Sequence, residues 1–231
     1  MKVVLIPGMD GTGFLFAPFI EVAPAGIEVI SLPLLQRADA DYDDQAKHII
    51  ASIGEEPIVL VAESYSGMVA YSMLKMGLPN IRHIVFAASF LGRPSALALW
   101  ARHIPVALLK SNIVPKFILS KLLFGHFTKE KLVSLFDKAL HAVSSETLSF
   151  RLNQIAMLPN TSIPIDIPCT YIRPTGDNLV SKRAIKVFQR LCRNLEIKEV
   201  DGTHFVLQTN PEMCWLVIQD VIESQKTTSH L

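Results

Sequence analysis

A serine lies where a strongly apolar segment turns directly into a segment of helical periodicity. In "IVLVAESYSGMVAYSML" the residues of Ile58–Ala62 are all apolar, and Ser64 follows them with no loop before a helix that begins near Tyr65. A hydroxyl on so sharp a strand-to-helix turn is held out above the sheet, provided that its neighbours are small. Ala62 and Ser66 are small. Ser64 is therefore a candidate nucleophile, although serine is also a favoured residue at helix N-termini.

An acid and a histidine occupy matching positions later in the chain. A serine hydroxyl attacks a carbonyl group only when a base takes its proton and a third group orients that base. Asp177 follows an apolar segment and the turn "RPTG", and His204 follows another apolar segment and "DGT". Taken singly, Asp177 could serve only a turn or a helix cap, and His204 could be an ordinary loop residue. Together, in the order Ser64, Asp177, His204, they predict a nucleophile, an acid and a base beyond the carboxyl ends of strands.

A glycine-rich segment near the N-terminus, "LIPGMDGTGF", matches a second requirement of acyl transfer. Its glycines, Gly8, Gly11 and Gly13, have the wrong order of gaps for a dinucleotide-binding loop. A tetrahedral oxyanion needs backbone N–H donors, one from the residue after the nucleophile and one from the loop after an early strand. We expect the N–H groups of Met9 and Tyr65 to form this oxyanion hole, with Gly8 bending the loop.

Short β-branched apolar segments alternate with segments of helical periodicity along most of the chain. This alternation is typical of a parallel sheet with helices on its faces, and it predicts the α/β class. The predicted strands are residues 3–6, 28–32, 58–62, 83–87, 169–173 and 195–200. The predicted helices are residues 13–22, 42–53, 65–76, 180–192 and 211–224.

Residues 90–158 interrupt this alternation, because their apolar residues recur at helical spacing without a strand-like run. Thr128 is placed to cap one of the helices in this interval. One face of that helix is predicted to carry Leu132, Leu135, Phe136, Ala139, Leu140 and Val143. We therefore expect a single domain whose core comprises residues 1–89 and 159–231, with residues 90–158 inserted as a helical cap.

The apolar character of the cap favours a substrate with an apolar acyl or alcohol portion. Trp100 in the cap, together with Phe14 and Met68 in the core, forms a tentative substrate pocket. The same side chains could instead do no more than pack the cap against the core. Glu63 and Arg173 lie near predicted strand ends, but charged side chains more often face solvent, and neither is given a role.

Composition limits the partners of the protein. Lys and Arg total 22 against 21 Asp and Glu, which gives no electrostatic reason to expect nucleic acid. The apolar start of the chain is stopped by Pro7 and Gly8 before it reaches signal-peptide length, and no uninterrupted apolar run of about 18 residues predicts a membrane span. Three separated cysteines without a C-x-x-C pair indicate a reducing compartment, so we expect a cytoplasmic protein. No metal site is expected, and the oligomeric state is left open.

The segment "YSMLK", Tyr71 to Lys75, matches the Y-x-x-x-K pattern of short-chain dehydrogenases. It follows the glycine-rich loop too closely for that enzyme class, and it lies on the helix that Ser64 precedes. Tyr71 and Lys75 are then an ordinary pair one helical turn apart.

Four motifs together resemble the α/β-hydrolase superfamily over nearly the whole chain. "LIPGMDGTG" is similar to its oxyanion segment, with Pro7 in place of the usual His, and "AESYSG" is similar to its nucleophile elbow. "RPTGD" resembles the acid turn and "DGTHF" the histidine loop. The insertion at residues 90–158 resembles the cap between the sixth and seventh strands of that fold. The chain departs from the family in starting at what would be the third strand and in having Ala62 and Ser66 where the elbow has glycines.

The resemblance implies a compact α/β-hydrolase fold of about six mostly parallel strands flanked by helices. It also implies a serine hydrolase that needs no cofactor and cleaves a carboxylic ester or thioester through an acyl-enzyme on Ser64. The substrate would be a small molecule or an acyl group linked to a carrier, with no stable insertion into a membrane. A ligand-binding protein of the same fold, with a silent or weakly active triad, is the alternative that the sequence leaves open.

Overall fold

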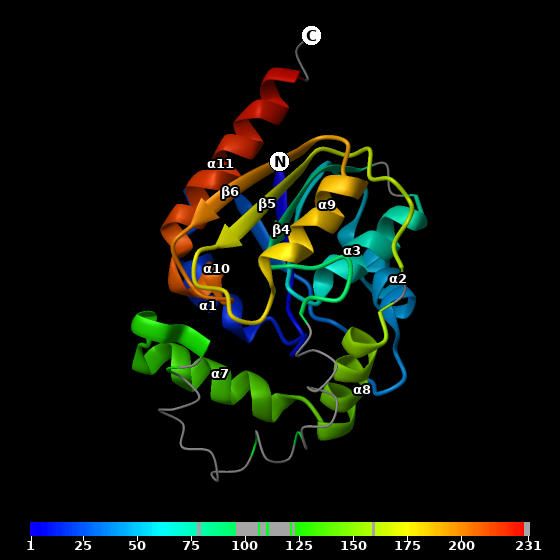
Figure 1. Cartoon of the computed structure of the whole chain (residues 1–231). Coiled ribbons are helices and arrows are strands. Elements are labelled where there is room, and N and C mark those ends of the chain that lie inside the picture. Colours follow the sequence, from blue (N-terminus) through cyan, green and yellow to red (C-terminus); the bar gives the residue numbers. More distant parts are fainter. Residues whose placement is uncertain are drawn as a thin grey trace.

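All the predicted strands are present and form one parallel sheet (Figure 1). The computed structural model describes residues 1–77, 80–95, 106, 110, 121, 123–158 and 160–228, and within these residues six strands lie in the order β2-β1-β3-β4-β5-β6. Their bounds are β1 (Lys2–Ile6), β2 (Glu28–Ser31), β3 (Ile58–Glu63), β4 (Ile81–Ala87), β5 (Cys169–Pro174) and β6 (Leu195–Val200). Each neighbouring pair is parallel, which confirms the predicted α/β class.

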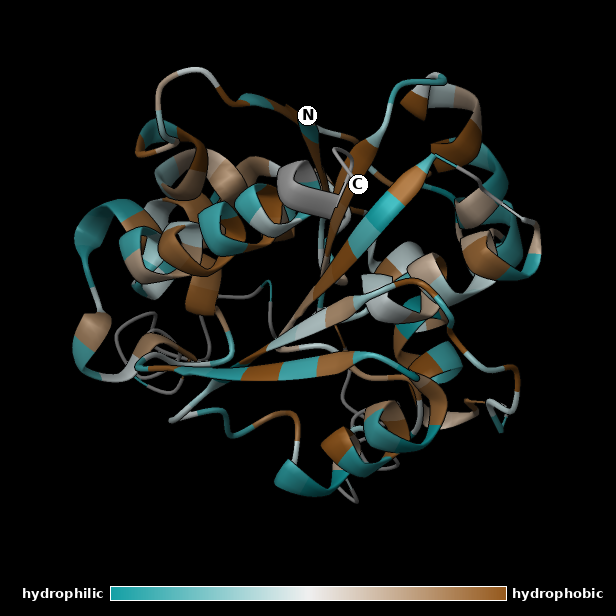
Figure 2. Ribbon diagram, turned by 90° about the horizontal axis from the view of Figure 1, so that it is seen from above, coloured by the Kyte–Doolittle hydropathy of each residue, from teal (hydrophilic) through white to brown (hydrophobic). Residues whose placement is uncertain are grey.

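Helices cover both faces of the sheet (Figures 1 and 2). One face packs against α2 (Tyr42–Ile53), α3 (Ser66–Lys75) and α9 (Ile185–Leu191), which follows η3 (Lys182–Ala184). The other packs against η1 (Phe14–Phe16), α1 (Ala17–Glu21), α10 (Val206–Thr209) and α11 (Pro211–Thr228). Because successive side chains of a strand point to opposite faces, a central strand between two helical layers must be apolar throughout. β3 is apolar from Ile58 to Ala62, and all its residues, including the terminal Glu63, are buried.

Two predicted helices divide: residues 180–192 into η3 and α9, and residues 13–22 into η1 and α1. The sequence pattern predicts a single helix over residues 13–22, whereas the structure has the 3-10 turn η1 followed by α1. Pro18 lies in the first turn of α1, where its missing N–H group leaves no unmade hydrogen bond. The chain therefore starts a new helix at this proline instead of continuing the previous turn.

Between β4 and β5 the described residues contain helices and no strand (Figure 1). η2 (Gly125–Phe127) precedes α7 (Glu130–Ala142) and α8 (Ser145–Ala156), which lie across the ends toward which the strand arrows point. Leu132, Ala139 and Val143 are buried, as the predicted apolar face of α7 requires. The prediction that Thr128 caps this helix is wrong. Lys129 is the N-cap, and the Thr128 hydroxyl donates instead to the Gly125 carbonyl at 2.7 Å, which closes η2.

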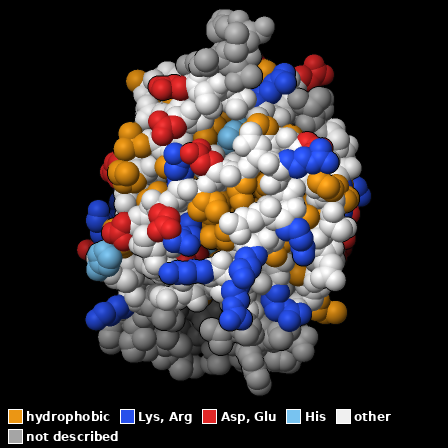
Figure 3. Space-filling model, turned by 45° about the horizontal axis from the view of Figure 1, so that its top comes forward, with side chains coloured by type: hydrophobic (Ala, Val, Ile, Leu, Met, Phe, Trp, Pro, Cys, Tyr) orange, Lys and Arg blue, Asp and Glu red, His pale blue; other side chains and the backbone are white. Residues whose placement is uncertain are grey.

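The surface carries both signs of charge. On the face shown in Figure 3, acidic and basic side chains are interspersed with apolar ones, as the balanced composition leads us to expect. None of the described helices is both long enough and apolar enough to cross a membrane.

The N-terminus of α3 packs very close to the segment that follows β4. A Cβ atom added at Gly67 would lie 2.0 Å from the Ser89 Oγ and 2.9 Å from the Phe90 carbonyl oxygen. The Ser89 hydroxyl in turn donates to the Ser64 carbonyl at 2.7 Å. Gly67 is thus the residue that allows the turn at Ser64 to approach β4, one position after the place where the elbow motif has its second glycine.

We expect Gly67→Ala to lower the free energy of unfolding by about 1–3 kcal/mol, because the new methyl group has no room beside Ser89 and Phe90. Urea unfolding measures the change. Adding Ser89→Ala should restore part of the loss, since the Ser89 Oγ is the nearest atom. Equal stability of Gly67→Ala and the wild type would show that the turn can relax away from β4.

His83 on β4 links the stability of the sheet to pH. The ring is buried, its Nε2 lies 2.9 Å from the Thr170 hydroxyl, and burial lowers its pKa to about 4. An unfolded histidine has a pKa of about 6.5, so between these values the unfolded chain binds a proton that the folded chain does not. Stability from this residue is therefore complete above about pH 6.5 and is lost as the pH falls toward 4.

We predict that the free energy of unfolding of the wild type falls on the order of 2 kcal/mol between pH 7 and pH 4 on account of His83. His83→Gln should remove this part of the pH dependence. His48→Gln, at a histidine whose ring makes no hydrogen bond among the described residues, is the matched control and should keep it. Urea titrations at several pH values test the prediction, which fails if both variants follow the wild-type curve.

Candidate active site

The loops after β1 and β3 meet where the chain changes direction across the sheet. From β1 the chain passes to β2 on one side, and β3 then pairs with β1 on the other side. Open α/β sheets form a crevice at such a point, outside the carboxyl ends of the strands. Residues 7–13 follow β1, and Ser64 follows β3, so the glycine-rich loop and the candidate nucleophile lie side by side.

Ser64 has a backbone conformation that few residues other than glycine adopt. Its φ is 48°, and among the described residues only Ala88 shares a positive φ without being glycine. The Ser64 N–H donates to the Ala87 carbonyl at 2.9 Å, and its own carbonyl accepts from Gly67 N–H at 3.1 Å. The Ser66 hydroxyl donates to the Pro7 carbonyl, which ties the turn to the loop after β1. The surrounding hydrogen bonds therefore hold the strained turn in place.

The structure brings Ser64, His204 and Asp177 into one hydrogen-bonded chain. The Nε2 atom of His204 lies 2.8 Å from Ser64 Oγ, and its Nδ1 atom lies 3.0 Å from Asp177 Oδ2. The other carboxylate oxygen of Asp177 accepts from the backbone N–H groups of Leu179 and Val180, at 2.8 and 2.9 Å. This geometry fits a nucleophile, a base and an acid that orients the base.

Burial and charge act in opposite directions on the pKa values of this pair. Burial disfavours the charged form of His204, but the adjacent Asp177 carboxylate, its hydrogen bond and the more distant Glu63 raise the pKa of the imidazole above its usual value. Burial likewise disfavours the Asp177 carboxylate, yet His204 and the two N–H donors lower its pKa. Asp177 is therefore ionised at neutral pH, in the form that stabilises a protonated imidazole.

The two residues predicted to form an oxyanion hole come from different segments: Met9 lies in the loop after β1, and Tyr65 directly follows Ser64. Met9 lines the cavity at Ser64, and Tyr65 is the N-cap of α3. Within the described part of the chain, neither the Met9 nor the Tyr65 N–H donates to a protein acceptor. Both N–H groups are thus available to a ligand atom. Their role as an oxyanion hole stays a prediction.

An apolar cavity of about 270 Å³ opens at Ser64 and His204. Its walls come from the core and from the helical segment between β4 and β5. The side chains contributed by α7 and α8 are Phe136, Ala139, Leu140, Leu148, Leu152 and Ile155. The core contributes Leu15, Phe90, Val180 and Phe205, among others. An apolar group covalently attached to Ser64 would find room here.

Neither Phe14 nor Met68, which were expected to line the substrate pocket, lines this cavity. The Phe14 ring is 37% exposed and lies under the Lys138 ammonium at 4.4 Å, while the next residue, Leu15, points inward. Met68 is buried in the core between the sheet and its helices. Trp100 lies outside the described residues. The cavity residues of α8, Leu148, Leu152 and Ile155, were not singled out in the sequence, although their spacing of i, i+4 and i+7 is that of one helix face and could have found them.

Glu63 is buried next to the cavity, contrary to the expectation that it faces solvent. It is 4% exposed, its Oε2 accepts from Gly8 N–H at 3.3 Å, and its Oε1 accepts from the Gln208 side chain at 2.9 Å. As the last residue of β3 it points toward the face covered by α10, which explains its burial. Burial raises the pKa of Glu63 to about 7. Arg173 pairs with Glu199 on β6 and does not line the cavity.

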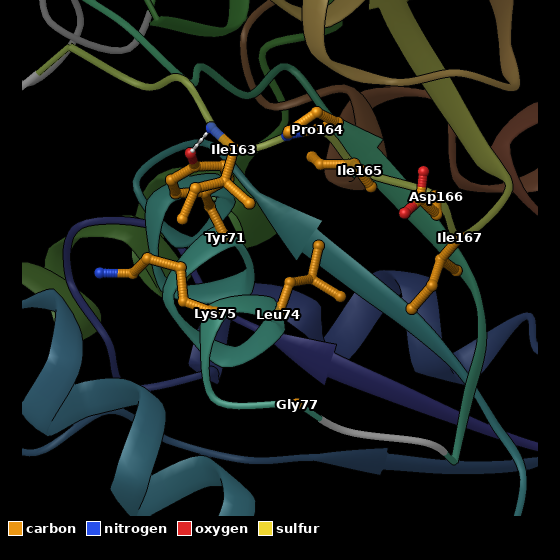
Figure 4. A pocket seen from close by; sticks show the side chains of 9 residues that line it. All are labelled: Tyr71, Leu74, Lys75, Gly77, Ile163, Pro164, Ile165, Asp166 and Ile167. Atoms are coloured by element: carbon orange, nitrogen blue, oxygen red, sulfur yellow. Dashed lines mark hydrogen bonds between the residues drawn. The ribbon is translucent and has the colours of Figure 1, made fainter.

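The Y-x-x-x-K pair lies elsewhere (Figure 4). The Tyr71 hydroxyl accepts from the backbone N–H groups of Ser162 and Ile163, at 3.2 and 2.8 Å. Lys75 forms an ion pair with Asp43 at 3.0 Å. Both border an open groove of about 460 Å³ that shares no lining residue with the cavity at Ser64. Tyr71 and Lys75 thus bind different partners and both hold α3 against its neighbours.

Comparisons with known proteins agree with this architecture. The model of the family described as "Alpha/beta hydrolase family" matches residues 3–214. None of the curated protein sequences matches the chain significantly.

Solved structures with the same fold have very different sequences. An esterase from Exiguobacterium antarcticum superposes with a TM-score of 0.79 at 14% identity, covering 96% of this chain and 92% of its own. For a hydrolase from Oleispira antarctica the TM-score is 0.80 at 11% identity, with 96% and 90% covered. For the RedJ thioesterase of prodiginine biosynthesis in Streptomyces coelicolor it is 0.67 at 17%, with 94% and 83% covered. These likenesses concern the fold, whereas the family model spans most of the sequence itself. The protein belongs to the alpha/beta hydrolase family.

Proposed function

We propose that the protein is a serine hydrolase that cleaves a carboxylic ester or thioester through an acyl-enzyme on Ser64. The observation that carries this proposal is the hydrogen-bonded chain from Ser64 through His204 to Asp177, which begins at the wall of an apolar cavity. The fold shared with an esterase and a thioesterase supports the reaction class.

In the first half of the reaction, the Nε2 of His204 takes the proton of the Ser64 hydroxyl while Ser64 Oγ attacks the substrate carbonyl carbon. The imidazolium that forms is stabilised by the Asp177 carboxylate. The carbonyl oxygen becomes negative and accepts hydrogen bonds from the backbone N–H groups of Met9 and Tyr65. The imidazolium then gives its proton to the leaving oxygen or sulfur, and an alcohol or thiol departs.

In the second half, a water molecule takes the place of the leaving group. His204 accepts a proton from the water as its oxygen attacks the acyl carbon, and the same N–H groups stabilise the second oxyanion. Collapse of this intermediate breaks the bond to Ser64 Oγ, which recovers its proton from His204. The products are a carboxylic acid and the original enzyme.

The cavity supports an apolar acyl portion in the substrate. Side chains of α7 and α8 form one of its walls, so the segment at residues 90–158 acts as a cap over a core formed by the rest of the chain. Apolar walls bind a hydrocarbon chain because they remove it from water. A small-molecule ester, a thioester and an acyl group on a carrier make the same demands on the site. The three cysteines are free and buried, which supports a place in the cytoplasm.

We expect a fluorophosphonate probe to form one adduct on Ser64 in the wild type and none in Ser64→Ala, because only a hydroxyl activated by His204 attacks the probe. Intact-mass spectrometry detects the adduct. Hydrolysis of p-nitrophenyl esters should fall at least about 1,000-fold in the variant. A circular dichroism spectrum identical to that of the wild type is the control for folding. A folded wild type that forms no adduct would favour a ligand-binding protein with a silent triad.

Ala139→Leu should shorten the acyl chain that the enzyme accepts, since Ala139 is 1% exposed and its side chain lines the cavity. We expect kcat/KM for an octanoyl ester to drop roughly tenfold or more while the value for an acetyl ester stays near that of the wild type. Ala142→Leu makes the same change at an exposed position of the same helix, and it should alter neither value. If Ala139→Leu changed kcat/KM by the same factor for both esters, the effect would not depend on chain length, and the acyl chain would not lie in this cavity.

A further inference from the structure

The loop after β1, residues 7–13, must hold the Met9 N–H in one direction if it is to bind an oxyanion. Gly8 and Met9 share a peptide bond, and the carbonyl of this peptide accepts from Gly11 N–H at 3.0 Å. The inference below concerns what holds the loop from outside, and it rests on the function proposed above.

On the core side, two side chains next to Ser64 hold the start of the loop. The Ser66 hydroxyl donates to the Pro7 carbonyl, and the Glu63 carboxylate accepts from Gly8 N–H at 3.3 Å. Glu63 is the last residue of β3, and Ser66 is the first residue of α3, just after the turn at Ser64. The peptide that precedes Gly8 is therefore fixed by the same turn that carries the nucleophile.

On the other side, the loop is held by an arginine from α8. The Nη1 atom of Arg151 donates to the carbonyls of Met9 and Asp10, at 2.7 and 3.0 Å, and its Nη2 atom donates to the Leu35 carbonyl at 2.7 Å. Arg151 thus fixes the peptide that follows Met9. The Met9 N–H lies between one peptide held by Glu63 and another held by Arg151.

Arg151 is an unusual residue for a helix that merely packs on the core. Its side chain is completely buried, and within the described residues no carboxylate lies at ion-pair distance from it. Burying a charge in this way is costly, and arginine is rarely buried without a charged partner. Burial lowers the pKa of the guanidinium, and the nearby Asp10 carboxyl opposes this shift. The three carbonyl acceptors are what compensate the desolvation, so loop and guanidinium depend on each other.

The same helix also reaches the second residue of the oxyanion hole. The Tyr65 hydroxyl donates to the Gln154 side chain at 2.5 Å, and the Arg151 guanidinium lies 5.8 Å from the centre of the Tyr65 ring. Arg151 and Gln154 are neighbours on α8, three positions apart. One helix of the inserted segment therefore contacts both residues whose N–H groups we assign to the oxyanion.

We propose that Arg151 is a positioning residue, which holds the carbonyls of Met9 and Asp10 so that the Met9 N–H points at the reacting carbonyl oxygen. Because Arg151 belongs to α8, the loop takes its active shape only when this helix is seated on the core. Removal of the guanidinium should then weaken transition-state stabilisation much more than substrate binding.

The experiment compares Arg151→Met and Arg151→Lys with the wild type and with Arg82→Met. Arg82 is exposed at the start of β4, at the opposite end of the sheet, and controls for the loss of an arginine. For each protein, kcat and KM for a p-nitrophenyl ester are measured on active enzyme counted by complete fluorophosphonate labelling. Hydrogen exchange of the amides in residues 8–11 is followed separately.

We expect kcat of Arg151→Met to fall on the order of 10- to 100-fold, with KM within about twofold of the wild type. The fall in kcat is smaller than that for removal of an oxyanion-hole donor, because the Met9 N–H is still present. Exchange at residues 8–11 should become faster. Arg151→Lys should lose less than Arg151→Met, because its ammonium keeps the positive charge and can still donate to one or two of the carbonyls. It should not match the wild type, since one ammonium cannot replace both guanidinium nitrogens. Arg82→Met should match the wild type in both measurements.

An unchanged kcat and unchanged exchange in Arg151→Met would overturn the proposal. If Arg151→Met does not fold, Arg151→Lys decides, and wild-type values in both measurements again count against it. A wild type without hydrolysis or labelling refutes the proposed function instead. The exchange measurement then decides alone whether Arg151 orders the loop.

Discussion

The positive φ of Ser64 is the constraint around which the rest of the site is arranged. A side chain in this conformation is held out of the sheet, but the backbone must fold back sharply, so whatever lies against the turn has to be small. Ala62 and Ser66 are small enough on either side, and Gly67 leaves room for Ser89. The Ser89 hydroxyl donates to the Ser64 carbonyl, and the Ser66 hydroxyl donates to the Pro7 carbonyl. Ser66, which replaces the second motif glycine, thus contributes a hydrogen bond that a glycine could not.

The charges near the turn suit the proposed mechanism, in which His204 is the base and the substrate carbonyl oxygen becomes negative. Asp177 raises the pKa of His204 through a direct hydrogen bond. Glu63 is closer to the loop after β1, where a negative charge would repel an oxyanion, but its burial favours the protonated form up to about pH 7. Arg151 supplies a positive charge on the far side of the same loop. The buried groups together thus create an electrostatic environment suited to an anionic intermediate.

The sequence predicted the sheet, and it singled out the three side chains that the structure joins in one hydrogen-bonded chain, because both depend on local patterns. Apolar runs bounded by turn residues marked all the strands to within two residues, and Ser64, Asp177 and His204 were recognised by their places after those strands. The cavity was harder, because a helix can present Phe14 or its neighbour Leu15 inward with equal ease and only tertiary packing decides. Glu63 and Arg151 were out of reach for a similar reason. Nothing local distinguishes a buried charge from an exposed one when its partners are backbone groups far away in the chain.

The buried guanidinium of Arg151 also bears on how far this protein can be treated as modular. The proposed cap looks exchangeable, since the chain leaves the sheet after β4 and returns to it at the neighbouring strand β5. Here, however, a segment that would be removed with the cap supplies donors to backbone carbonyls of the first loop of the core. A chimera that carried a foreign cap would keep Ser64, His204 and Asp177 and yet lose part of what holds the loop after β1. Grafting therefore has to transfer an arginine at the position of Arg151 together with the new cap.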